Sequence, residues 1–84
     1  MNRQEILDKL MRIFSREFEI DNPGLDDDLR EKYEFDSIDA ITLLQEIETM
    51  LQVSLSQQEK KSAMDIRTIR QICDYVENIA KNRS

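Results

Sequence analysis

The sequence predicts an all-α fold, a small four-helix bundle with three longer helices, one short helix and a long loop between the first two. Three observations predict it. Apolar residues recur at helical spacing in four segments, and no segment shows the strict alternation of a strand. The only proline and the only glycine are adjacent, at residues 23–24, and mark a loop. With 84 residues in all, we expect a single domain over residues 1–84.

Three of the four expected helices begin at a capping box, a pair of side chains three residues apart that satisfies free backbone N–H groups. The pairs are Asn2 with Glu5, Ser56 with Glu59, and Thr68 with Gln71. The expected spans are residues 3–18, residue 36 or 37 to residue 51, a short helix after residue 56, and residues 68–80. The apolar stripe of the last helix comprises Ile69, Ile72, Val76 and Ile79.

Residues 19–36 form a long loop, which is unusual in so small a domain and is often a sign of function. We expect Leu29 and Tyr33 to pin this loop to the core, through a short helical turn. Acidity is concentrated here, since residues 19–50 hold eleven acidic and two basic side chains. This charge would steer basic partners toward the region, and the alternative is a merely solvated acidic surface.

Composition argues against several classes of protein. The net charge of −6 argues against nucleic-acid binding, because phosphates would repel the chain. No apolar run approaches the roughly 18 residues of a membrane span, and the charged N-terminus does not resemble a signal peptide. The single cysteine, Cys73, cannot form an internal disulfide, which suits a reducing compartment. We therefore expect a cytoplasmic protein, and nothing argues against a monomer.

The helical wheel of residues 38–51 separates a core face from an outer face. The core face comprises Ala40, Leu43, Leu44, Ile47, Met50 and Leu51. Ile38 and Ile41 fall outside it. Their side of the helix is flanked by the carboxylates of Asp39 and Glu46 on one edge and of Glu48 on the other. Two interpretations stay open: these isoleucines pack under the acidic loop, or they form a docking patch with a charged rim.

Ser37 stands between Asp36 and Asp39 at the start of this helix. A catalytic serine needs an adjacent base, usually histidine, and the chain has none. A carboxylate does not deprotonate a hydroxyl at neutral pH unless its pKa is strongly shifted. Ser37 is therefore interpreted as a helix cap or as a serine that another enzyme modifies. Because a Gly-rich phosphate loop and a Cys/His metal set are also missing, we predict no catalytic residue and no metal site.

The segment FDSIDAITLLQEIE, residues 35–48, resembles the signature of acyl carrier proteins, in which an Asp-Ser-Leu motif opens the second of four helices. The chain length, the acidic middle and the long first loop extend the resemblance over essentially the whole chain. Asp74-Tyr75-Val76 in the last helix is also similar to the family's Asp-Tyr-Ile.

The resemblance implies that Ser37 carries 4′-phosphopantetheine, installed from coenzyme A with Mg²⁺ by a phosphopantetheinyl transferase. The thiol of this arm would hold acyl groups as thioesters. It would present them to acyl-transferring, condensing or acyl-activating enzymes with basic docking patches, so the carrier itself would not be an enzyme.

The resemblance also implies roles for other side chains. The residues expected to dock partner enzymes are Asp36, Ile38, Asp39, Ile41 and Glu48. An acyl chain entering between the second and third helices would meet a second set. That set comprises Leu44, Ile47, Leu55, Ala63 and Tyr75.

The chain departs from fatty-acid carriers at several positions. Glu34-Phe35 stands where those carriers usually have Gly-Ala, and Lys60-Lys61 is basic where theirs is acidic. We therefore favour a specialised, free-standing carrier for a lipid, polyketide or peptide pathway. The alternatives are a housekeeping fatty-acid carrier, an unmodified carrier-like interaction module and an unrelated helical adaptor.

Overall fold

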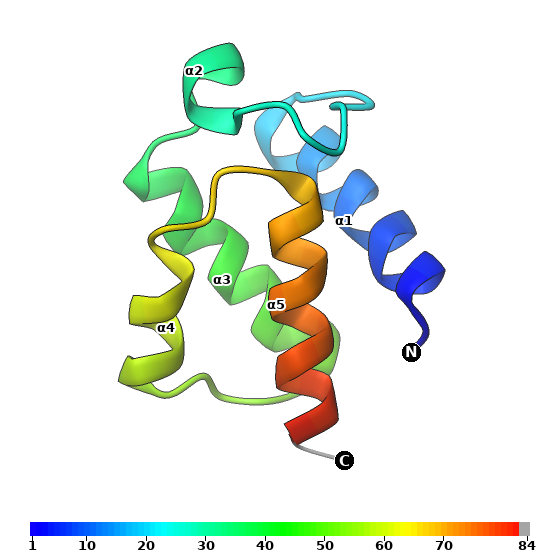
Figure 1. Cartoon of the computed structure of the whole chain (residues 1–84), viewed down its shortest axis with the longest axis vertical. Helices are drawn as coiled ribbons and strands as arrows, with labels where there is room; N and C mark the ends of the chain where they lie inside the picture. The colour runs from blue at the N-terminus through cyan, green and yellow to red at the C-terminus, as the bar shows by residue number, and fades with distance from the viewer. Residues whose placement is uncertain (83–84) are drawn as a thin grey trace.

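The computed structural model describes residues 1–82, and within that range it contains five α-helices and no strand. The helices are α1 (Arg3–Phe18), α2 (Leu29–Tyr33), α3 (Ser37–Leu51), α4 (Gln57–Ala63) and α5 (Ile69–Asn82). The predicted all-α bundle is confirmed, and α2 is the short helical turn expected inside the long loop. Figure 1 shows α2 and the preceding loop at the end of the bundle where α3 begins. None of the helices of residues 1–82 has the length and apolar character needed to cross a membrane.

All three predicted capping boxes are present. A side-chain oxygen of each cap residue accepts the N–H of the residue three positions later: Asn2 from Glu5 at 2.9 Å, Ser56 from Glu59 at 3.1 Å, and Thr68 from Gln71 at 3.2 Å. Since the first N–H groups of a helix have no partner within the helix, these bonds determine where α1, α4 and α5 begin.

The core lies between α1, α3 and α5. The core face predicted for α3 is confirmed, because Leu43, Leu44 and Ile47 are buried and the other three predicted residues pack against the core. A cluster of three phenylalanines closes the end of the core near α2. The Phe35 ring stacks on Phe14 with centroids 5.4 Å apart and meets Phe18 edge-on at 5.1 Å. This cluster anchors the chain just before α3.

Each carboxylate of the run at residues 26–28 has a structural partner. Asp26 pairs with Arg70 of α5 at 2.8 Å, and this hydrogen bond lowers the pKa of the Asp26 carboxyl. Asp27 accepts the Gly24 N–H at 2.8 Å, which lowers its pKa as well. The side chain of Asp28 caps α2 by accepting two N–H groups of its first turn. The run therefore folds the loop onto the start of α5, a role that its composition alone does not predict.

Tyr75 joins α5 to α4. Its hydroxyl donates to the carbonyl oxygen of Glu59 at 2.8 Å. Burial of the ring, with a smaller contribution from the carboxylates of Glu59 and Glu48, raises the pKa of Tyr75 to about 12. The neutral hydroxyl is thus the form that the fold requires.

Tyr75→Phe should lower the free energy of unfolding at neutral pH by about 0.5–1.5 kcal/mol, because one hydrogen bond is lost. It should also weaken the loss of stability above pH 10. In the parent, the unfolded tyrosine ionises near pH 10 while the folded one keeps its proton to about pH 12, so rising pH favours unfolding across that window. Urea unfolding of both proteins at pH 7, 9 and 11 checks this. If the parent and Tyr75→Phe lost equal unfolding free energy between pH 9 and 11, the prediction would be contradicted.

Candidate functional site

The start of α3 is set by a fourth capping box. Asp36 Oδ1 accepts the Asp39 N–H at 2.9 Å, and Asp39 Oδ2 accepts the Asp36 N–H at 3.3 Å. Asp36 is thus the N-cap, and Ser37 is the first residue within the helix. The interpretation of Ser37 as a helix cap is therefore wrong.

Ser37 is exposed, and its hydroxyl forms no hydrogen bond within residues 1–82. Phe35, only two positions earlier, is buried in the aromatic cluster. The chain thus turns from the core to the surface within two residues, and this turn presents the serine outward. A negative group attached there would meet the positive end of the α3 dipole, which stabilises it.

Chemically, the site offers a hydroxyl and does not activate it. The two nearest carboxylates, Asp36 and Asp39, are occupied with backbone N–H groups. Cys73 is buried, and this burial raises the pKa of its thiol, so it is no substitute nucleophile. Among residues 1–82 no three acidic, histidine or cysteine side chains are grouped to hold a metal ion.

The predicted docking residues lie together around the start of α3, with one exception. Ile38 is 72% exposed and Ile41 is 53% exposed, so neither packs under the acidic loop. Asp36 is exposed and Asp39 half-buried. Glu48 lies near the other end of the helix and is half-buried.

Two acidic residues of α3 have structural partners that the wheel does not reveal. Glu48 Oε2 accepts the Leu55 N–H at 2.8 Å and so holds the connection between α3 and α4. Glu46 forms an ion pair with Arg16 of α1. By contrast, Asp36 and Asp39 pair with no cation in the described part of the chain, so their charge faces solvent.

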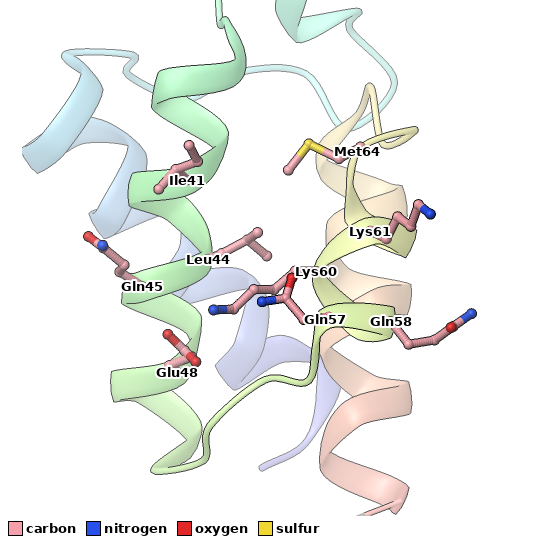
Figure 2. A pocket seen from close by; sticks show the side chains of 9 residues that line it. All are labelled: Ile41, Leu44, Gln45, Glu48, Gln57, Gln58, Lys60, Lys61 and Met64. Atoms are coloured by element: carbon pink, nitrogen blue, oxygen red, sulfur yellow. The ribbon is translucent and has the colours of Figure 1, made fainter.

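An open groove of about 640 Å³ runs between α3 and α4 (Figure 2). Its walls are lined by Ile41, Leu44, Gln45 and Glu48 from α3, and by Gln57, Gln58, Lys60, Lys61 and Met64 from α4 and its end. Ser37 lies one helical turn before Ile41. Because residues four apart share one face of a helix, the groove continues the stripe of α3 that begins at Ser37.

Behind this groove lies a much smaller interior cavity of about 20 Å³. Four of the five residues predicted to contact an acyl chain line it: Leu44, Ile47, Ala63 and Tyr75. Leu55 is buried in the core but does not line this cavity. A space of this size holds about one water molecule, so an alkyl chain could enter only if the helices around the cavity moved apart.

Phe35 and Ile66 also line the interior cavity, and neither was predicted to do so. Phe35 had a usable signal. An apolar residue directly before an N-cap often packs against the fourth helical residue, which here is Ala40, and Ala40 lines the same cavity. Ile66 had no such signal, because it lies in the irregular segment between α4 and α5.

A protein-family model described as a phosphopantetheine attachment site matches residues 8–76. The chain belongs to this family. It is a carrier protein of the acyl carrier type, whose members bear a covalently attached 4′-phosphopantetheine and act as carriers rather than as catalysts. Such a carrier interacts with a phosphopantetheinyl transferase and with acyl-handling enzymes. Comparison with curated proteins and with solved structures gives no match.

Ser37→Ala should change the free energy of unfolding of the carrier by less than about 0.5 kcal/mol, because an exposed side chain outside the cap is removed. Asp36→Ala should lower it by about 0.5–2 kcal/mol, the usual effect of a lost N-cap. Asp36→Asn, which keeps an acceptor at the cap, serves as the control and should stay close to the parent. Urea unfolding measures all three. A larger loss in Ser37→Ala than in Asp36→Ala would contradict the assignment of the cap.

Proposed function

We propose that this carrier holds its 4′-phosphopantetheine on the hydroxyl of Ser37, and that residues 1–84 form one carrier domain. The observation that carries the proposal is the capping of α3 by Asp36. It leaves Ser37 exposed, free of hydrogen bonds and without a structural role, inside the region that the family model matches. The modification therefore displaces no contact of the fold.

In the transfer, Ser37 Oγ attacks the coenzyme A phosphorus that bears the pantetheine arm. A P–O bond of the pyrophosphate breaks, and adenosine 3′,5′-bisphosphate leaves. The carboxylates beside Ser37 already accept backbone N–H groups, so the serine proton passes to a base of the transferase. The transferase also supplies the Mg²⁺. Once attached, the arm supplies a thiol that holds an acyl group as a thioester.

We propose that partner enzymes dock on the outer face of α3 near the serine. Ile38 and Ile41 supply exposed apolar area, and Asp36 and Asp39 supply charge that no cation of the described chain neutralises. A basic partner with an apolar contact surface would cover the two isoleucines and pair with the two carboxylates. Glu48 would add charge at the far end of the face, although its Oε2 already accepts a backbone N–H.

We infer that the carrier serves a specialised lipid, polyketide or peptide pathway in the cytoplasm. Two features support a specialised role: the bulky Phe35 packed in an aromatic cluster, and the basic pair Lys60 and Lys61 on α4. Lys60 and Lys61 alter a surface that a general fatty-acid enzyme would meet, whereas the buried Phe35 changes the packing just before the docking face. The free, buried thiol of Cys73 supports a reducing compartment. For a cargo with an alkyl chain, we propose that Leu44, Ile47, Ala63 and Tyr75 line its binding space after the cavity widens.

Incubation with coenzyme A, Mg²⁺ and a broad-specificity phosphopantetheinyl transferase should raise the intact mass of the protein by one phosphopantetheine. Ser37→Ala should gain nothing, since no other exposed hydroxyl opens α3. Intact-mass spectrometry reads both outcomes directly. If the folded parent gains no mass, the chain acts as an unmodified interaction module. If the alanine variant gains the same mass, another residue bears the arm.

Ile41→Glu should slow transfer to Ser37 about five- to tenfold, because apolar contact is lost from the centre of the docking face. Its unfolding free energy should change by less than about 0.5 kcal/mol, since the residue is exposed. Thr49→Glu, which adds the same charge to an exposed position further along α3, is the control. Transfer rates and urea unfolding are measured for both. Equal slowing by the two variants, or melting of Ile41→Glu, would refute the docking role of Ile41.

A further inference from the structure

Lys60 occupies an unusual position for a cation in this acidic protein. Figure 2 shows its side chain extending from α4 across the groove toward α3, while that of Lys61 points away from α3. Lys60 is half-buried and forms no ion pair in the described part of the chain. Arg3, Arg16, Lys32 and Arg70 each contact a carboxylate, whereas Lys9, Arg12 and Lys61, like Lys60, form no ion pair in the described chain. Lys60 differs from these other cations in that its side chain extends across the groove. Lys60 is thus available to an anion that comes from outside the fold.

The groove has an apolar end and a polar end. Ile41, Leu44 and Met64 line the end nearer to Ser37. Beyond them, Gln57 and Lys60 extend from α4 toward α3 and offer hydrogen-bond donors, whereas Gln45 lies at the rim and points away from α4. An apolar lining with a few convergent polar groups suits a small molecule that has a short hydrocarbon part and an anionic tip.

A carboxylate would be confined to this groove. The interior cavity holds only about 20 Å³, and transfer of an ionised carboxylate into an apolar interior is strongly unfavourable without a partner. Among the residues that line the cavity, Arg30 is the single cation, and it donates to the Met64 carbonyl oxygen. The two spaces therefore separate cargo by chemistry, with alkyl groups suited to the interior and carboxylates to the groove.

Attachment to the carrier favours a tethered acyl group over a free ligand as the molecule that binds in this groove. One partly exposed lysine binds a free carboxylate only weakly. A group tethered at Ser37, one turn before the groove begins, has an effective concentration of the order of millimolar, so a weak contact is enough to position it. A free metabolite or an acidic protein has no such advantage at this site.

We propose that the α3–α4 groove binds an acyl group whose far end is a free carboxylate, with Lys60 as its counter-charge. This proposal rests on Ser37 as the attachment site and specifies the class of cargo. Lys60 acts as the recognising group, and Gln57 donates a hydrogen bond beside it. Glu48 stands at the same end of the groove and opposes the carboxylate, so the contact is one of positioning and not of tight binding.

The test loads Ser37 directly from succinyl-coenzyme A or butyryl-coenzyme A with the broad-specificity transferase, so that two four-carbon cargoes differ only in the terminal group, a carboxylate or a methyl. Intact mass confirms loading. The succinyl form should shift the amide NMR signals of Gln57 and Lys60 relative to the butyryl form. The pKa of its ¹³C-labelled carboxylate should be lower in the parent than in Lys60→Gln by about 0.2–0.7 units, the range expected for an exposed ion pair.

Lys61→Gln is the matched control, because it removes the same charge from the neighbouring position. Lys61→Gln should leave most of the lowering of the carboxylate pKa in place. Glu48→Gln should enlarge that lowering, because it removes the opposing charge. Equal losses in Lys60→Gln and Lys61→Gln would indicate a diffuse positive field and overturn the proposal. Identical spectra for the succinyl and butyryl forms would also overturn it while leaving the carrier function intact. Failure of the folded parent to load would remove both proposals together.

Discussion

The capping box between Asp36 and Asp39 is the constraint on which the rest of the site depends. Because it ends the loop at residue 36, the residue before it points into the core and the residue after it points outward. Phe35 then completes the aromatic cluster with Phe14 and Phe18, and Ser37 is left exposed. Anchor, cap and serine occupy three consecutive positions, so the place of the serine on the surface follows directly from the packing of the core.

The helices were largely predictable because their signals are local. Capping boxes mark the starts of α1, α4 and α5 by spacing alone. The ends of helices were predicted from the end of each apolar pattern, since no glycine stands there. Glu19, Glu34 and Gln52 adopt the left-handed conformation after α1, α2 and α3. These residues give no signal of this in the sequence, where glycine is the usual marker.

The site was predictable in its chemistry but only partly in its contacts. The missing histidine excluded a catalytic serine, and the wheel of α3 placed Ile38 and Ile41 outside the core. The partners of individual carboxylates were not predictable, because they come from distant parts of the chain. Asp26 meets Arg70, and Glu46 meets Arg16. Charge counting treated all these carboxylates as one acidic field, whereas only some of them are free to meet a partner.

The carboxylates of this domain differ in their contacts: some stabilise the fold, and others keep a negative charge on the surface. Several carboxylates further from Ser37 are used by the fold: Asp28 caps α2, and Asp26 and Glu46 form ion pairs with α5 and α1. Those beside Ser37 also cap a helix, but their partners are backbone N–H groups and no cation of the described chain pairs with them. Asp36 and Asp39 therefore hold the start of α3 and still present their negative charge to solvent. One pair of side chains thus fixes the serine in place and keeps negative charge beside it, which is economical in a core as small as this one.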